Sequence, residues 1–365
     1  MNFDYSDDQK MLKEEARRFL AAKCDARAVR AVLDDAGQSH DAGLWRAVAE
    51  QGWLGTAIPE AYGGLGLGHV ELCALAEELG RACAPIPFAS TVYFVAEALM
   101  LFGSEAQKAK WLPRIAAGEV IGAFATSEGK GPVTRRSIRT TVSGGKLTGE
   151  KIPVTDGDVA DLIVVLAKDG LYLVEKGAGV SPEVLTTLDP TRSAAKLVLS
   201  GAPAERLGDE DGIDAMQAVF DRAAVLLAFE QIGGADRSLE MAKGYALERF
   251  AFGRAIAGYQ AIKHKLADIY VKNEIARSNA YYGAWALNTS AAELPLAAAT
   301  ARVAASEAFW FASKENIQTH GGIGFTWEAD PQLLYRRSRQ LSLVAGAPST
   351  WRERLVSQLE ARNAA

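Results

Sequence analysis

The sequence predicts an α+β protein that is mainly α-helical, with an N-terminal helical domain, a small antiparallel β domain and a C-terminal four-helix bundle. Apolar residues recur at three- and four-residue spacing over 1–118 and again over 209–365, which is typical of helices. Between them, over 119–208, short β-branched runs are punctuated by glycine and aspartate, which is typical of strands and turns. The last third holds four or five long helical segments, enough for a bundle.

In the N-terminal domain, we expect the first helix to begin at Asp7 and Asp8. The glycine-rich segment 59–80 is predicted to be a loop that leads into a helix, with Gly80 as the C-terminal stop of that helix. Residues 105–119 form another short helix, which ends the domain.

In the C-terminal domain, helical spacing returns near residue 211 and persists to the end of the chain. Breaks are expected near Gly253, 288–294, 321–324 and 346–348, where glycine, asparagine or proline interrupts the pattern. No internal repeat is found.

Composition indicates a globular protein that acts on neither nucleic acid nor membranes. The chain has 365 residues, of which 49% are hydrophobic and 23% charged, and its net charge of −5 disfavours anionic partners. No apolar run is long enough to cross a bilayer. The N-terminus resembles no targeting segment, and the three cysteines have no metal-like spacing and favour a reducing cytoplasm. The four histidines are scattered, so no metal site is expected.

Five segments together resemble the acyl-CoA dehydrogenase family. They read "GWLGTAIPEAYGGLGLGHVELCALAEELGRACAPIPF", "LPRIAAGE", "LTGEKIPVTDGDVADLIVVLA", "YALERFAFGRAIAGYQAIKHKLADIY" and "QTHGGIGFTWEADPQLLYRRSR", in the family's order and across nearly the whole chain. The resemblance implies an acyl-CoA substrate, FAD as cofactor, a homo- or hetero-tetramer with a related subunit, and electron-transferring flavoprotein as acceptor. It also implies that FAD lies between the β domain and the bundle, with its ADP half reaching into the neighbouring subunit.

The resemblance assigns the break at 249–260 to that neighbour's cofactor. Arg249 resembles the arginine that reaches the partner's flavin pyrophosphate, because a guanidinium offers forked donors to phosphate oxygens. Phe252 and Gly253 turn the chain past the cofactor, and Gln260 resembles a nearby polar contact. The alternative is a plain helix–helix turn with a solvated arginine.

A second glycine-containing segment is also assigned to the partner's cofactor. By resemblance, the residues from Gln318 through Gly322 contact the adenosine side of the partner's FAD; these residues are Gln318, Thr319, His320, Gly321 and Gly322. The alternative is an ordinary helix C-cap, and His320 is expected to be structural rather than catalytic. In the β domain, Thr126 and Thr155 match threonines that touch the isoalloxazine ring, or are simple β-turn threonines.

The family's catalytic base is missing from both of its usual positions. Removal of the substrate α-proton needs a carboxylate, yet Ala345 and Ala223 occupy the two places where relatives carry it. Glu230 lies seven residues after Ala223, about 10 Å along the same helix face, among apolar residues that suit a base for carbon acids. Glu230 is therefore the candidate base. The alternatives are a buried glutamate paired with an arginine, or one that faces another subunit.

Other departures concern the chain's own flavin face. The loop "SEGKGPVTRRS" lacks the family's phosphate-binding Gly-Ser-Asp, and its Lys130, Arg135 and Arg136 are either substitutes for it or a solvated basic loop. Pro153 replaces an aromatic residue, and Ala224 replaces an arginine. Two hypotheses follow. The chain is a working dehydrogenase for a bulky or branched acyl group, or it is the non-catalytic partner in a heterotetramer. A reductase running the reaction backwards has no positive support.

Overall fold

The computed structural model describes residues 5–35 and 37–364 and divides the chain into two compact units. Unit 1 comprises Met1–Val29, Cys73–Ala84 and Ala224–Ala365, and unit 2 comprises Arg30–Leu72 and Pro85–Ala223. Within the described residues, no helix is both long and apolar enough to cross a membrane. The mainly helical fold with a small sheet region confirms the predicted fold class.

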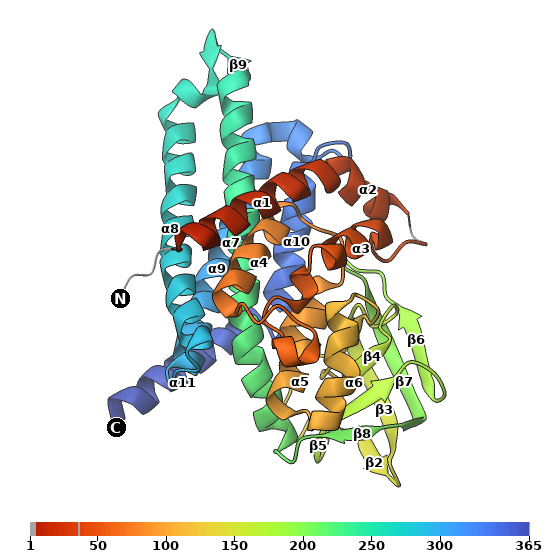
Figure 1. The fold of residues 1–365 in the computed structure, drawn as a ribbon. Helices are drawn as coiled ribbons and strands as arrows, with labels where there is room; N and C mark the ends of the chain where they lie inside the picture. The colour runs from red at the N-terminus through yellow and green to blue at the C-terminus, as the bar shows by residue number, and fades with distance from the viewer. Residues whose placement is uncertain (1–4, 36, 365) are drawn as a thin grey trace. The chain divides into compact units, whose positions relative to one another are not determined.

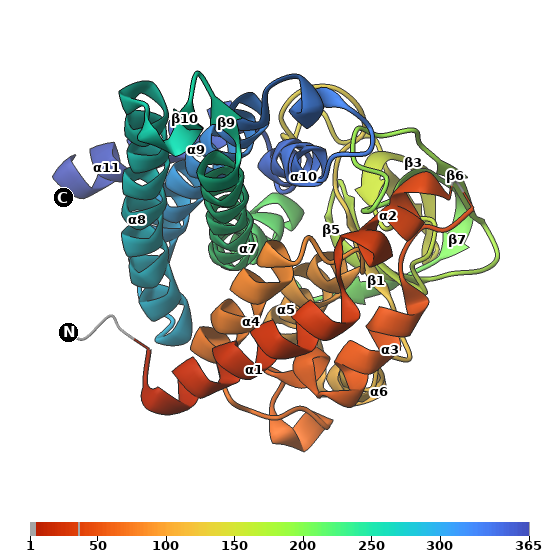
Figure 2. The same cartoon turned by 90° about the horizontal axis from the view of Figure 1, so that it is seen from above.

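Unit 1 is helical and holds the long helices of the C-terminal region, which run side by side in Figures 1 and 2. Its helices are α1 (Asp7–Lys23), the first part of α2 (Ala26–Asp34), most of α4 (His69–Arg81), most of α7 (Gly212–Glu248), α8 (Gln260–Asn288), α9 (Leu294–His320), α10 (Pro331–Leu343) and α11 (Pro348–Ala364). Helix α1 begins at the predicted place, because Ser6 and Gln9 form a capping box around its first turn. The four predicted breaks in the C-terminal region are all confirmed.

Two glycines allow α4 and α7 to cross at very short range in unit 1. A Cβ atom on Gly80 would lie 1.8 Å from the carbonyl oxygen of Glu230, and one on Gly233 would lie 1.8 Å from that of Glu77. The prediction that Gly80 stops α4 is wrong, since the helix continues to Arg81. Gly80 is required instead for close packing of two helix backbones, which the local sequence does not reveal.

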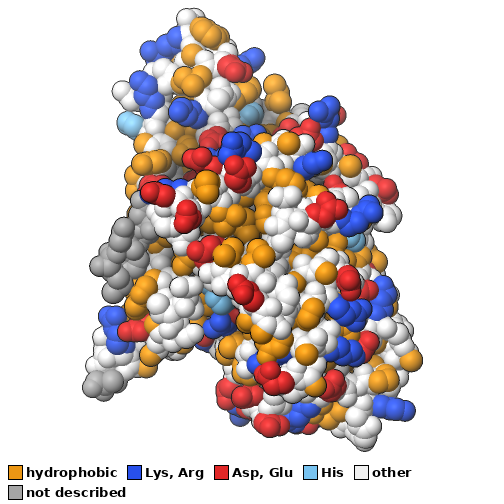
Figure 3. Space-filling view, in the orientation of Figure 1, with side chains coloured by type: hydrophobic (Ala, Val, Ile, Leu, Met, Phe, Trp, Pro, Cys, Tyr) orange, Lys and Arg blue, Asp and Glu red, His pale blue; other side chains and the backbone are white. Residues whose placement is uncertain are grey.

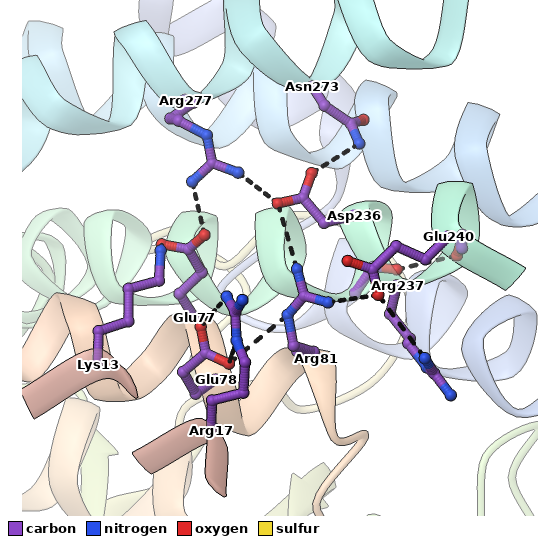
Figure 4. Close-up of polar contacts among 12 residues, drawn as sticks. Lys13, Arg17, Glu77, Glu78, Arg81, Asp236, Arg237, Glu240, Asn273 and Arg277 are labelled. Atoms are coloured by element: carbon purple, nitrogen blue, oxygen red, sulfur yellow. Dashed lines mark hydrogen bonds and ion pairs between the residues drawn. The ribbon is translucent and has the colours of Figure 1, made fainter. Parts of the chain in front are cut away.

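Ion pairs then tie α1, α4, α7 and α8 together (Figure 4). Buried Glu77 of α4 accepts from Lys13 of α1 and Arg277 of α8, each at 2.5 Å. Arg277 also donates to Asp236 of α7. Because Glu77 is almost wholly removed from solvent, burial raises its pKa, but its two cationic partners outweigh that effect and the pKa is lowered.

Unit 2 contains the β domain and the remaining N-terminal helices. The helical elements are the rest of α2, α3 (Ala42–Glu50), two short 3-10 helices (Trp53–Gly55 and Glu60–Tyr62), the first turn of α4, the π-helical segment Ala89–Ala96, α5 (Glu97–Phe102), α6 (Glu105–Ala116) and the first third of α7. The strands are β1 (Gly122–Ala125), β2 (Thr141–Ser143), β3 (Lys146–Thr155), β4 (Leu162–Ala167), β5 (Gly170–Glu175), β6 (Val180–Val184), β7 (Ala194–Pro203) and β8 (Glu205–Leu207).

The strands form two sheets, in the orders β1-β4-β5-β8 and β2-β3-β7-β6. All pairs are antiparallel as predicted except β1 with β4, which pair in parallel because a long connection, 126–161, joins them. The alternating inward residues of both sheets, among them Val165, Tyr172 and Leu197, make one buried apolar core.

Candidate functional site

Arg249 lies at an exposed tip of unit 1, between α7 and α8. The chain there forms a minimal hairpin from β9 (Phe250–Ala251) and β10 (Arg254–Ala255), with Phe252 at φ +50° and Gly253 at φ +79° in its turn. The Tyr259 hydroxyl donates to the Ala251 carbonyl at 2.9 Å and fixes the hairpin from one side. In the described part of the chain, the Arg249 guanidinium has no hydrogen-bond or ion-pair partner. It is therefore available to a ligand or another subunit.

The segment Gln318–Gly322 ends α9 and turns away from it. Gly321 has φ +66°, a left-handed conformation that favours glycine, and a Cβ atom on Gly321 or Gly322 would meet open space. Gln318 is exposed, whereas Thr319 is buried and its hydroxyl donates to the Glu315 carbonyl at 2.7 Å. The main chain at these glycines can be approached closely by a ligand.

His320 joins this segment to the hairpin. Its ring stacks on Tyr245 with centroids 4.3 Å apart, and its Nδ1 lies 2.8 Å from the Asn316 carbonyl oxygen. Tyr245 lies one turn before Arg249, so the stack brings the guanidinium and the glycine bend to the same end of unit 1. This contact gives His320 a structural position, as the sequence indicates. Gln260, the first residue of α8, is also exposed at this end.

Large apolar side chains are exposed at the same end of unit 1. Phe252 is 97% exposed and Phe325 is 79% exposed, and Phe250, Ile323 and Trp327 are also largely open. Apolar and basic side chains occur together over this tip in Figure 3. An exposed group of large apolar side chains of this kind is typical of interaction surfaces.

The two threonines of the β domain lie in unit 2 at the ends of two strands, one from each sheet. Thr126 follows β1 and is buried, and its carbonyl oxygen accepts from the Lys151 ammonium of β3 at 3.2 Å. Thr155 ends β3 opposite Ala194 and is partly exposed. This hydrogen bond joins the end of β1 to β3, and the contact of either threonine with the isoalloxazine ring stays a prediction.

The loop after Thr126 is organised around Glu128, which the sequence reading did not single out. Its carboxylate accepts from the Arg139 N–H at 2.6 Å, the Thr140 hydroxyl at 2.7 Å and the buried Lys151 ammonium at 2.7 Å. Burial alone would raise the pKa of the Glu128 carboxyl, but these donors outweigh burial, and the pKa is lowered. Burial lowers the pKa of the Lys151 ammonium. The Glu128 carboxylate thus ties the start of this loop to the residues just after it and to β3.

Of the three basic residues predicted as phosphate contacts in this loop, Arg135 is already engaged. It forms ion pairs with Asp211 and Asp214 at the start of α7. Lys130 and Arg136 are exposed. Pro153 is exposed within β3.

Glu230 is almost completely buried in unit 1, and its surroundings are not purely apolar. Its Oε1 lies 3.8 Å from Nη1 of the fully buried Arg337, which also donates to the carbonyls of Cys83 and Ala84. Burial lowers the pKa of a second buried guanidinium, Arg302, to about 9, and the charge of Glu230 opposes that shift. These arginines come from α9 and α10, which the sequence around Glu230 could not indicate. The geometry is that of a buried glutamate paired with an arginine.

The alanines that replace the family's base and arginine are packed rather than open. Ala223 and Ala224 are both buried. Ala345 follows α10, and its carbonyl oxygen accepts from the Trp351 indole at 3.0 Å. Arg302 donates to the carbonyls of Leu341 and Val344 just before it. None of these positions offers a proton acceptor from its side chain.

A buried charge cluster in unit 2 was also missed. Glu97 of α5 contacts His69 Nε2 at 2.6 Å and accepts from Arg222 Nε at 2.6 Å. Burial alone would raise the pKa of Glu97, but His69 and Arg222 together lower it to about 2. The signal in the sequence was an unexplained glutamate within the apolar run 92–102.

Comparison with known proteins decides the family. The acyl-CoA dehydrogenase N-terminal domain model matches residues 6–119, and the C-terminal domain model matches residues 210–359. An acyl-CoA dehydrogenase of Mycobacterium tuberculosis, IpdE2, is 34% identical over 354 residues, which cover 97% of this chain and 98% of that protein. The chain belongs to the acyl-CoA dehydrogenase family.

Solved structures agree with this assignment. Butyryl-CoA dehydrogenase from Megasphaera elsdenii has a TM-score of 0.90 at 25% identity, covering 98% of this chain and 100% of that one. The ChsE4-ChsE5 complex from Mycobacterium tuberculosis contains a chain with a TM-score of 0.89 at 27% identity, covering 99% of each.

Members of the acyl-CoA dehydrogenase family are FAD-dependent oxidoreductases, and FAD is the cofactor. In unit 1, the free guanidinium of Arg249 and the open glycine bend fit a pyrophosphate and the adenosine beside it. Bound FAD would supply the hydride acceptor for this chemistry.

Proposed function

We propose that this chain is a subunit of a heteromeric acyl-CoA dehydrogenase and contributes Arg249 and the segment Gln318–Gly322 to the FAD site of a related, catalytic subunit. One observation carries the proposal. The Arg249 guanidinium and the main chain at Gly321 and Gly322 are open to a neighbour, whereas both positions for the chain's own catalytic base carry methyl groups.

The contributed groups have the chemistry that the role requires. Arg249 can offer two parallel N–H donors to phosphate oxygens, and no contact within the described chain competes for them. The glycines at 321 and 322 leave the main chain open to a ligand. Exposed Phe252 and Phe325 surround these groups and would be buried by a second subunit.

This chain lacks the groups that an active site of its own would need. Neither Ala223 nor Ala345 can accept the substrate α-proton, and the loop 127–137 lacks the phosphate-binding Gly-Ser-Asp that relatives carry there. The ChsE4-ChsE5 structure is a complex of two differently named proteins and contains a chain with this fold, which supports a mixed assembly.

The alternative is a self-sufficient dehydrogenase with Glu230 as base and a bulky or branched acyl group as substrate. It requires space for a bulky group beside Ala223 and Ala224, and both side chains are buried. It also requires Glu230 to reach the substrate, and Glu230 faces Arg337. These observations favour the subunit role.

Electron-transferring flavoprotein as acceptor and a cytoplasmic location stay predictions.

Exchange of Glu230 for glutamine separates the two functions. In the subunit role, flavin reduction by acyl-CoA in the assembled complex is expected to stay within about twofold of the unmodified complex. Loss of a general base costs about 100-fold or more. Stopped-flow bleaching of the flavin measures the rate, and the amount of bound flavin is the control. A 100-fold slower rate with full flavin content would establish Glu230 as the base.

Exchange of Arg249 for glutamine tests the contributed site. Removing one charge-assisted phosphate contact costs about 1.5–3 kcal/mol, so FAD is expected to bind the complex at least tenfold more weakly. The matched control is Lys243→Gln, an exposed cation on α7 with no predicted role. Fluorescence titration of the flavin-stripped complex gives both affinities. Equal affinities for the two variants would rule out the role of Arg249.

A further inference from the structure

The hairpin beside Arg249 carries a second exposed guanidinium, that of Arg254. The hairpin joins α7 to α8 (Figure 1), and Arg254 is the first residue of β10. Within the described residues, the Arg254 side chain has neither a hydrogen-bond partner nor an ion-pair partner. The proposed function gives this cation no role.

The register of the hairpin places Arg249 and Arg254 on the same face. Arg254 pairs with Ala251, and directly paired residues of antiparallel strands point to the same side. The Ile256 N–H donates to the Arg249 carbonyl at 2.8 Å, so the pairing continues as far as Arg249. Because side chains alternate along a strand, Arg249 shares the face of Ala251 and therefore that of Arg254. The small side chain of Ala251 lies between the two cations on this face.

Contacts near the hairpin hold the Arg254 side chain in place. Its guanidinium carbon lies 4.0 Å from the centre of the Tyr259 ring. Its Cδ atom passes Gly258, where an added Cβ would lie 3.4 Å away. The Tyr259 hydroxyl donates to the Ala251 carbonyl, which anchors the ring to β9. A guanidinium stacked on an aromatic ring keeps the N–H donors at its edge available, so Arg254 is pre-organised for an oxygen acceptor.

The charge of this segment favours an anionic ligand. Apart from His264, residues 243–264 carry four cationic side chains and one carboxylate, which are Lys243, Arg249, Arg254, Lys263 and Glu248. Arg249 and Arg254 belong to the hairpin, whereas the two lysines lie on α7 and α8. The two guanidinium groups are therefore the cations that one ligand on the hairpin face would meet together.

The diphosphate of FAD carries two negative charges, one on each phosphate group. Arg249 alone offsets one of them. Association with a second subunit would remove the exposed Phe252 and Phe325 from water, and an unpaired charge is costly in such surroundings. A second guanidinium on the same face offsets the remaining charge.

We infer, on the basis of the proposed function, that Arg254 binds the FAD diphosphate of the catalytic subunit together with Arg249, with one guanidinium on each phosphate group. The forked donors of arginine match phosphate oxygens. Tyr259 is a positioning residue, because its stack restricts Arg254 before the ligand arrives and so reduces the entropy lost on binding.

Arg254→Gln is expected to weaken FAD binding to the assembled complex at least tenfold, through the loss of one charge-assisted contact. Arg254→Lys is expected to lose less affinity, because the charge remains. The matched control is Lys263→Gln, which removes the same charge from the exposed first turn of α8 and is expected to change the affinity by less than about twofold. Fluorescence titration of the flavin-stripped complex gives the affinities, and sedimentation of that complex shows whether its subunits stay associated.

The outcomes separate this contact from the subunit role. If Arg249→Gln weakens FAD binding but Arg254→Gln behaves like Lys263→Gln, the inference is overturned and the subunit role stands. If Arg249→Gln has no effect, the proposed function fails. Dissociation of the flavin-stripped complex by Arg254→Gln would also overturn the inference, because Arg254 would then bind the partner protein rather than the cofactor.

Discussion

Replacement of Glu97 with glutamine is expected to lower the free energy of unfolding by about 3–5 kcal/mol. Glu97 is fully buried and touches both His69 and Arg222, so its loss leaves a buried guanidinium without its counter-charge. Urea unfolding followed by circular dichroism measures the change. Glu307→Gln is the matched control, since its ion pair with Arg352 is exposed and is expected to contribute less than about 1 kcal/mol.

The same cluster makes stability depend on pH. Because the fold lowers the pKa of Glu97 from 4.5 to about 2, its stabilisation is fully present above pH 4.5 and is lost as pH falls toward 2. The shift corresponds to about 3 kcal/mol. The stability difference between the unmodified protein and Glu97→Gln should therefore shrink by about 1.4 kcal/mol for each pH unit as the pH falls from 4.5 toward 2. A difference that stays constant over this range would show that Glu97 does not titrate in this way.

Gly80→Ala is the second substitution with a large expected effect. The new Cβ would lie 1.8 Å from the Glu230 carbonyl oxygen, a backbone atom that cannot move without displacing α7. We expect a loss of about 3 kcal/mol or more, at the upper end of the cost of overpacking. Thermal or urea unfolding of the purified variant measures it.

The matched control lies on α7 itself. Gly244 is exposed, and a Cβ atom there would meet nothing within 4 Å. Gly244→Ala should therefore stabilise the protein by about 0.5–1 kcal/mol through helix propensity. If Gly80→Ala were as well tolerated as Gly244→Ala, the close crossing of α4 and α7 would be wrong.

Local sequence signals predicted most of the fold. The helix breaks at Gly253, 288–294, 321–324 and 346–348 all occur, because glycine, asparagine and proline act on the backbone where they stand. The role of Gly80 could not be predicted, since it depends on a close contact with Glu230 of α7, which lies 150 positions later in the chain.

The candidate site residues likewise divide into those that local sequence could indicate and those that depend on tertiary contacts. The exposed positions of Arg249, Gln318 and Gly322 suit the sequence-based hypothesis, which remains a prediction until a ligand is observed. Glu230 shows what its own stretch of sequence cannot reveal. The residues beside it in the chain are apolar, as the sequence analysis noted, but Arg337 and Arg302 approach it from other helices. Glu128 and Glu97 were overlooked for the same reason, since each finds its partners through tertiary contacts.

Flavin stoichiometry tests the central proposal most directly. The chain is purified alone and also after co-expression with a longer member of the family from the same genome, and FAD is quantified by absorbance after denaturation. A contributing subunit should be colourless alone and should form a yellow complex with half as many flavins as polypeptide chains. A chain that purifies alone with one FAD per polypeptide, and whose flavin is bleached by an acyl-CoA, would contradict the account.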